Sequence, residues 1–307
     1  MGDKLRISLN SNQKTKHHLP NIRSAFGYIV SFILILMLFV LFFLWRQNRL
    51  LERQIEELSK QHGVVNEVNV ELQRQIDQLD NQSEDDRRMH YLITLHDTTM
   101  STSVRLQAAK SFLDFERRHG VTHPDMSRVD FSGDDLMGIV FTQTILTRAN
   151  FVTATLVRSD LQQADLQKAD FRQANMRGVN LQQANLKGAD LNGAILLQAD
   201  LREADLSGAI LRRAALSNAL LSKAILRQVS LSEAALNGAS LRQADLSGAT
   251  LAGAFLRTAD LSEAILIDSD LSDTHLEHVI LKNAKYNDQT QWPENFNPKT
   301  AGAIQVD

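Results

Sequence analysis

Histidine is the residue type in this chain best suited to binding a metal or moving a proton, and two pairs lie close in sequence. His119 and His123 are four residues apart, a spacing that zinc sites use. No third donor is well placed beside them, so the expected role is capping of a helix end or exposure to solvent. His275 and His278 fall on outward positions of the repeat described below and are expected to be surface residues. No metal site is predicted.

Motifs for catalysis are missing from the sequence as well. It contains no glycine-rich phosphate loop, no nucleophile elbow and no zinc-protease helix motif. It has no cysteine, which excludes disulfides, thiolate metal sites and cysteine nucleophiles. The formal net charge of −3 gives no overall attraction to nucleic acid. The prediction is a protein that is not an enzyme, with no catalytic residues and no cofactor.

An apolar segment near the N-terminus has the length of a membrane span. Residues 24–45 contain no charge and no proline, and a helix of about 20 apolar residues crosses a bilayer. A buried core helix is seldom apolar all round over this length, and a cleaved signal peptide would end in small residues. The prediction is a single-pass membrane protein, in the inner membrane if bacterial. A slight excess of basic residues before the span places the N-terminus in the cytoplasm.

A seven-residue pattern follows in residues 46–80. Two apolar series four residues apart form an a/d seam, and an asparagine at one a position favours a parallel two-stranded coil. The prediction is a coiled-coil stalk that forms a parallel homodimer. The alternative is a lone amphipathic helix packed on its own chain. The seam residues are Leu51, Ile55, Leu58, Val65, Asn69, Leu72, Ile76 and Leu79.

The longest regular feature is a five-residue period. From Phe131 to Tyr286 a large apolar residue recurs 32 times without an insertion. Five residues overshoot a helical turn by about 140°, and an odd period sends strand side chains to alternate faces. The pattern is satisfied if three extended residues are followed by a two-residue corner. The first and third residues of "A-D-L-x-x" then point inward, and the second points outward.

These residues resemble the pentapeptide-repeat proteins, whose motif is A-(D/N)-L-x-x. The resemblance implies a mainly β fold, a right-handed quadrilateral parallel β-helix with four pentapeptides per coil. The 32 units would make about eight coils. Because Phe131, Phe151 and Phe171 are 20 residues apart, they are expected to stack inside one wall. Each coil would contact only its neighbours, as in other solenoids.

The two ends of the array need covers, because an open β-helix presents unpaired backbone. Asp134 occupies an inward position, which is costly unless the carboxylate is paired or wet. It predicts that the first coil is open or irregular and is capped by the helices before it. The tail, with Trp292 and Pro293, resembles the Trp-Pro tail of the family and is expected to plug the far end. The predicted organisation is a basic N-terminal tail (1–23), transmembrane helix (24–45), coiled-coil stalk (46–80), hinge and capping helices (81–125), β-helix (126–286) and C-terminal cap (287–307).

The outward residue before each central leucine is usually Asp or Asn, but it becomes apolar between residues 210 and 225. The sequence therefore predicts an apolar belt around the tube, joined to an apolar stripe along one wall. Exposed apolar patches usually mark interaction surfaces. The alternative is repeat drift, since aliphatic residues are tolerated at half-exposed strand sites. The candidate interaction residues are Ile195, Ile210, Ala215, Leu220, Ile225, Ala235 and Phe255.

The function predicted from these features is structural. The chain is interpreted as a membrane-anchored scaffold whose β-helix binds another protein laterally. Some members of the family mimic DNA and bind type II topoisomerases, which gives the alternative of a DNA-like inhibitor. Between Arg128 and Tyr286, however, 16 basic residues are interleaved with 18 acidic ones, and a DNA mimic needs a large field of one sign. Nucleic acid itself is not an expected partner.

Overall fold

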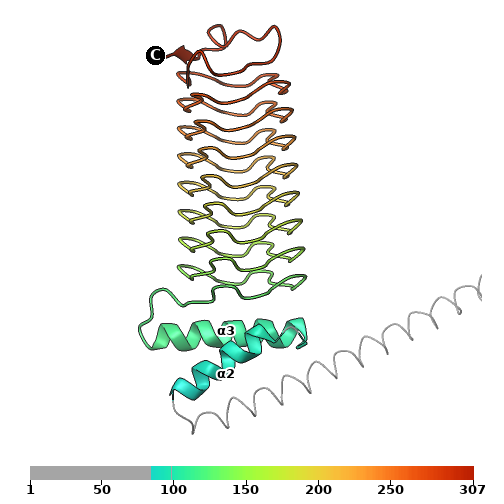
Figure 1. Ribbon diagram of the computed structural model, residues 1–307, viewed down its shortest axis with the longest axis vertical. Coiled ribbons are helices and arrows are strands. Elements are labelled where there is room, and N and C mark those ends of the chain that lie inside the picture. Colours follow the sequence, from blue (N-terminus) through green and yellow to red (C-terminus); the bar gives the residue numbers. More distant parts are fainter. Residues whose placement is uncertain (1–83, 98) are drawn as a thin grey trace, which may run out of the picture. The chain divides into compact units, whose positions relative to one another are not determined.

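The computed structural model describes residues 84–97 and 99–307 of the chain. Most of this part is a right-handed quadrilateral parallel β-helix, drawn in green to red in Figure 1, with two helices across one end. The elements are α2 (Glu84–His96), α3 (Thr102–Arg118), β1 (Lys285–Tyr286) and β2 (Ile304–Gln305).

The predicted 20-residue coil is confirmed by the backbone pairing. Each outward residue forms a parallel bridge with the residue 20 positions later, from Asp125 with Ile145 to Ile265 with Lys285. The first coil is therefore 125–144, and the ladder continues without a break through the array. Neighbouring coils are stacked directly on one another (Figure 1). Each of the four walls is a column of such bridges.

The two residues after each central leucine make the corner. In a typical unit the amide of Ala149 donates to the carbonyl of Leu146 across the turn, at 3.1 Å. The second corner residue, Arg148, has a φ of 57°. The same left-handed φ recurs at every fifth residue from Arg128 to Asn283. This is the geometry of a type II turn, which favours glycine at that place.

A corner threonine gives a test of this turn geometry. Thr258 has a φ of 58°, a conformation that is costly for a β-branched side chain. We expect Thr258→Gly to raise the free energy of unfolding by about 0.5–1 kcal/mol, because strain is removed at the cost of some chain entropy. Thr250→Gly is the matched control, because Thr250 is an exposed wall residue without a positive φ. It should lower stability in the same urea titration. An equal effect at both sites would contradict the assignment.

The interior of the tube is filled by the central residues and the alanines before them. These side chains are buried, most of them completely. The predicted aromatic stack is confirmed: the ring centroids of Phe131 and Phe151 are 5.5 Å apart, and those of Phe151 and Phe171 are 4.7 Å apart. Phe141 contacts the first two rings from the next-but-one unit. The first three coils therefore share an aromatic core.

The helix α3 covers the open end of the first coil, and α2 packs on α3 (Figure 1). Phe112 and Leu113 of α3 are buried against the tube core. Arg117 donates to the carbonyls of Val140 and Thr142, at 3.3 and 3.4 Å. Such carbonyls at the rim of a β-helix have no coil below them to bond. The helix supplies donors in place of a preceding coil.

Arg105 of α3 enters the tube and corrects the prediction made for Asp134. The carboxylate is inward and buried, but it forms an ion pair with Arg105 at 2.5 Å. The same guanidinium donates to the carbonyl of Asp130. The first coil is neither open nor irregular, because Asp130 and Asp135 form regular bridges to the second coil. The buried carboxylate of Asp134 is therefore neutralised by the guanidinium of Arg105, and neither water nor an open coil is needed to accommodate it.

The tail continues the array at the other end. β2 pairs in parallel with β1, so that Ile304 lies beside Lys285. The ring of Trp292 packs edge-on against Tyr286, at 5.5 Å between centroids, and stacks on Phe296. The amide of Leu271 bonds to the carbonyl of Gln291. The tail residues thereby cover the last coil with both backbone and aromatic side chains.

The predicted membrane localisation is corrected by the structure. Within residues 84–97 and 99–307, no helix is long and apolar enough to span a bilayer. α3, the longer of the two helices, has 17 residues and carries several charges, whereas a span needs about 20 mainly apolar residues. The predicted span 24–45 lies outside the described residues. So does the coiled-coil seam within 46–80, and the parallel homodimer stays a prediction.

Candidate interaction surface

The outward aspartates and asparagines have a structural task that the sequence pattern alone did not reveal. Their side-chain oxygen accepts a hydrogen bond from the amide two residues later, at the first corner position. Asp130 accepts from Ser132 at 2.9 Å, and Asp190 accepts from Asn192 at 3.0 Å. This is an Asx turn, which Asp and Asn favour. The signal was present in the sequence as an Asp or Asn placed two residues before many corners, including those of all seven successive units from Asp160 to Asp190.

Many of these aspartates are also paired with cations. Some partners lie on the same corner, as with Asp200 and Arg202 at 2.6 Å, and others lie on the preceding coil, as with Asp205 and Lys187 at 3.0 Å. Burial raises the pKa of Asp200, but hydrogen bonds from Arg202 and Gln182 outweigh it and leave the pKa below its usual value. The further ion pairs of this kind are Arg172–Asp170, Lys187–Asp205, Arg227–Asp245 and Arg242–Asp260. Three of the walls therefore carry charges of both signs.

These pKa shifts predict acid sensitivity. Partial burial raises the pKa of Asp245, but hydrogen bonds from Ser247 and from Arg227 lower it more. Because the pKa of Asp245 is lower in the folded than in the unfolded chain, its ionised carboxylate stabilises the fold. This stabilisation is complete above the unfolded pKa of about 3.8 and is lost as the pH falls through the folded pKa. We expect the urea midpoint of Asp245→Asn to fall less steeply than that of the unmutated protein between about pH 4 and pH 2. Parallel curves would contradict this assignment.

The apolar belt is formed by the outward residues of four successive units, Ile210, Ala215, Leu220 and Ile225. The three large side chains are exposed by 40, 40 and 37%, whereas Ala215 is half-buried. Since successive units lie on successive walls, the belt runs once around the tube. It brings one apolar residue onto each wall rather than a compact patch onto one.

The predicted stripe lies on a single wall, named here the Phe255 wall. Ile195 and Phe255 are exposed by 39 and 43%, and the two alanines between them are half-buried. The ring of Phe255 stacks on His275 in the next coil, with centroids 4.7 Å apart and planes 10° apart. This aromatic pair was not foreseen. The column consists of Asp135, Thr155, Asn175, Ile195, Ala215, Ala235, Phe255 and His275.

His119 and His123 do not form a site together. Nδ1 of His119 donates to the carbonyl of Phe115, and Nε2 lies 3.3 Å from Glu84. His123 bonds to the hydroxyl of Thr122. No group of three or more His, Asp or Glu side chains that could hold a metal is found in 84–97 and 99–307. This accords with the expected role of His119 at a helix end, since it is the C-cap of α3.

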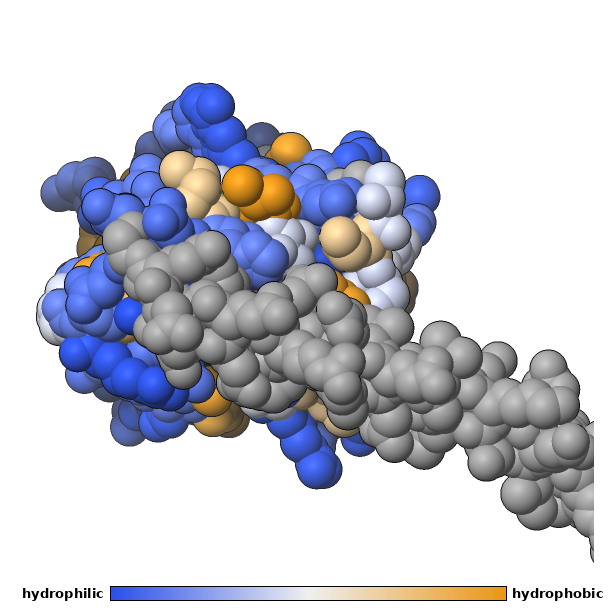
Figure 2. All heavy atoms as spheres, turned by 90° about the horizontal axis from the view of Figure 1, so that it is seen from below, coloured by the Kyte–Doolittle hydropathy of each residue, from blue (hydrophilic) through white to orange (hydrophobic). Residues whose placement is uncertain are grey.

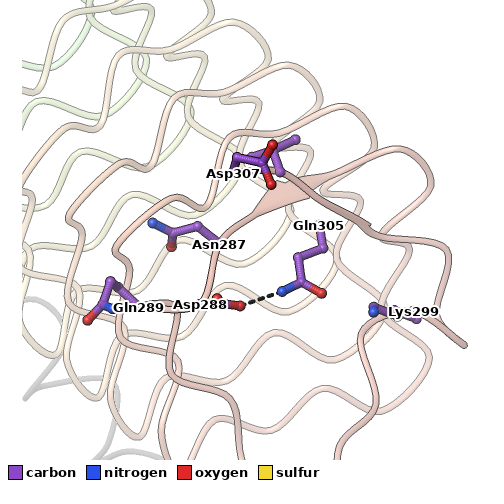
Figure 3. A pocket seen from close by; sticks show the side chains of 7 residues that line it. Asn287, Asp288, Gln289, Lys299, Gln305 and Asp307 are labelled. Atoms are coloured by element: carbon purple, nitrogen blue, oxygen red, sulfur yellow. Dashed lines mark hydrogen bonds between the residues drawn. The ribbon is translucent and has the colours of Figure 1, made fainter.

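The ends of the molecule offer little that resembles a binding site. An open hollow of about 460 Å³ beside the tail is lined by polar residues and Val306, and the side chain of Gln305 bonds to Asp288 across it (Figure 3). At the opposite end, the surface around the helices is mostly hydrophilic with separate apolar areas (Figure 2). Exposed apolar side chains of α2 include Met89 and Ile93.

Comparison with known proteins identifies the repeat. A family model described as pentapeptide repeats matches in eight copies, and the matched segments cover residues 125–283, more than half of the chain. HetL, a pentapeptide repeat protein involved in heterocyst differentiation regulation from the cyanobacterium Nostoc, is 27% identical over 63% of this chain and 91% of HetL, with a TM-score of 0.37. Rfr23, a pentapeptide repeat protein from the cyanobacterium Cyanothece, is 40% identical over 30% of this chain and 63% of its own, with a TM-score of 0.30.

A third solved structure is QnrB1, a plasmid-mediated fluoroquinolone resistance protein. It is 18% identical, with a TM-score of 0.33, and the match covers 56% of this chain and 92% of QnrB1. No curated protein matches the sequence. HetL and Rfr23 are both described as pentapeptide repeat proteins.

Proposed function

Because the chain belongs to the pentapeptide-repeat family, we propose that it is a non-enzymatic interaction module whose β-helix binds a protein partner through its lateral surface. The observation that carries this proposal is the replacement of outward Asp and Asn by exposed isoleucine, leucine and phenylalanine. Pentapeptide-repeat proteins are generally structural or interaction modules. The organisation into 81–125, 126–286 and 287–307 is part of the same proposal.

The physical cost of these replacements argues against repeat drift. An outward aspartate accepts the corner amide, as Asp190 does from Asn192. An isoleucine at the same place, such as Ile210, cannot accept that bond and remains 40% exposed. The chain thus loses a turn hydrogen bond without gaining burial in return. A local departure that does not help folding is expected where a surface serves a partner.

The test is affinity capture with the full chain and its variant Leu220→Asp with Phe255→Asp. Aspartate is the commonest outward residue of the array, so the variant should fold, with an unchanged circular dichroism spectrum. A protein partner captured by the unmutated chain should be lost from the variant. The matched control is Ser240→Asp with Thr250→Asp, which places charge at outward polar sites and should keep the partner. Identical capture by all three proteins would refute the proposal.

The structure gives no specific support to a DNA-like inhibitor. The carboxylates on the walls accept bonds from their own corners and pair with arginine or lysine, as in Asp170 with Arg172. Charges of both signs on one wall do not produce the large field of one sign that mimicry of DNA requires. Protein binding through apolar residues is the function that the geometry favours.

A further inference from the structure

One wall of the β-helix differs from the other three in charge. The units with an outward residue on the Phe255 wall contain no aspartate or glutamate from 154–158 through 254–258. Their cations are Arg158, Arg177 and Arg257, all exposed. Over the same coils each of the other walls carries acidic side chains. This wall therefore combines positive charge with the apolar stripe.

The arginines of this wall also differ in their contacts. The side chains of Arg158, Arg177 and Arg257 make no hydrogen bond or ion pair with any residue in the part of the chain that the structure describes. An acid at the corner before the wall, Glu233, is already bound to Arg213 at 2.8 Å. On the other walls Arg128 and Arg148 have no acidic partner either, but five arginines have one within 2.5–3.2 Å: Arg172, Arg202, Arg213, Arg227 and Arg242. The three unpaired guanidinium groups are free to meet carboxylates of another molecule.

The backbone of the wall limits the kind of partner that fits. The amide of Ala215 donates to Ala194, and its carbonyl accepts from Leu196. Ala235 and Phe255 are bonded to their neighbouring coils in the same way. A partner strand would need free backbone groups at an edge, and the wall offers none. Recognition must use side chains, which suits an amphipathic helix laid on the wall.

The dimensions of the wall set the length of that helix. Coils are about 4.8 Å apart, so Arg177 and Arg257, four coils apart, are separated by about 19 Å along the tube. A helix rises 1.5 Å per residue, and about 13 residues span this distance. Ile195 lies between the coils of the two arginines, and Phe255 lies in the same coil as Arg257, with its ring held by His275 at 4.7 Å. A fixed aromatic ring is a suitable anchor at an interface.

We propose that the Phe255 wall binds an amphipathic helix of a partner protein, with acidic residues near both ends of its apolar face. This inference rests on the proposed function and adds the chemistry of the partner. The carboxylates pair with Arg158 and Arg177 at one end and with Arg257 at the other. The apolar face covers Ile195, the two alanines and Phe255. A polyphosphate backbone would match the arginines but not the apolar stripe between them.

The experiment uses two labelled helical peptides of about 14 residues with the same leucine face. One carries glutamates beside both ends of that face, and the other carries lysines. Binding to the purified full chain is followed by fluorescence anisotropy, with a DNA oligonucleotide as a third probe. We expect the glutamate peptide to bind about tenfold more tightly than the lysine peptide. Its affinity should fall as salt rises from about 50 to about 500 mM.

Substitutions assign the binding to one wall. Phe255→Asp should lower the affinity for the glutamate peptide about tenfold. Arg177→Glu with Arg257→Glu should remove the preference for the glutamate peptide over the lysine peptide. Ile225→Asp is the matched control on the opposite wall and should leave the affinity unchanged. Aspartate is native to outward positions, and glutamate is native at Glu277 to the corner position of Arg177 and Arg257. These variants therefore keep the fold, which circular dichroism verifies.

Each other outcome overturns the inference. Equal binding of the two peptides, tighter binding of DNA, or no binding of either peptide would do so. A larger effect of Ile225→Asp than of Phe255→Asp would do so as well. A change in the sedimentation of the full chain on Phe255→Asp would assign the wall to a second copy instead. If the capture experiment with Leu220→Asp and Phe255→Asp still loses a partner, the proposed function stands and only the nature of that partner is wrong.

Discussion

Replacing Arg105 with alanine is expected to lower the free energy of unfolding by about 3–5 kcal/mol, the usual loss when one member of a buried ion pair is removed. Asp134 is only 2% exposed and would keep its carboxylate inside the first coil without a partner. The carbonyl of Asp130 would lose a donor as well. Urea unfolding measures the loss, and hydrogen exchange should show it first at the amides of the first coil, because coils depend on their neighbours.

The double variant Arg105→Ala with Asp134→Ala is the control. Alanine is the usual residue at the inward position of Asp134, so removing both charges should recover most of the stability.

The pH dependence gives a second check. Burial raises the pKa of Asp134 although Arg105 opposes the shift. Because the pKa of Asp134 is higher in the folded than in the unfolded chain, the ionised carboxylate lowers the free energy of unfolding increasingly as the pH rises above about 3.8. Below that pH the effect vanishes. Equal loss in the single and double variants would contradict the assignment.

Phe151→Ala should have an effect of similar size, about 3–5 kcal/mol, because it opens a cavity in the aromatic core. The ring of Phe151 is fully buried. It stacks on Phe131 below and on Phe171 above, where the planes are 3° apart. The loss therefore breaks contacts with both neighbouring coils. The urea midpoint and the near-ultraviolet spectrum of the full chain measure it.

Phe151→Leu is the matched control for that variant. Leucine is the usual central residue of the repeat, and the same coil already accommodates it at Leu156. A change between large apolar residues usually costs less than about 1.5 kcal/mol. A cost for leucine as large as that for alanine would show that the stacking geometry, rather than the filled volume, stabilises these coils.

The fold could be predicted because its pattern is local and repeated. A large side chain every five residues and a small one two places before it leave few packings, and the 20-residue spacing of Phe131, Phe151 and Phe171 agreed with the coil length. The pairing of Asp134 with Arg105 could not be predicted, because it joins a helix to a coil through a contact 29 residues apart. Nothing in the spacing of α3 indicates which side chain enters the tube.

The candidate surface was predictable only in outline. The sequence shows that Ile195 and Phe255 replace polar residues, since their column follows from the period. It does not show that the Asx turn is the reason for aspartate elsewhere, or that His275 stacks on Phe255. It also does not show which arginines find partners, because Arg172 and Arg177 occupy the same position in successive units and only Arg172 is paired.

The bridge spacing of 20 residues also governs how such an array can change in length. Duplication of one pentapeptide moves everything beyond it a quarter turn, so that Phe255 would leave its column and the stripe would be split between two sides. Duplication of four pentapeptides adds one complete coil and restores every column. Related proteins that keep a binding wall intact should therefore differ in array length by multiples of 20 residues. Insertions of any other length should occur only outside the array.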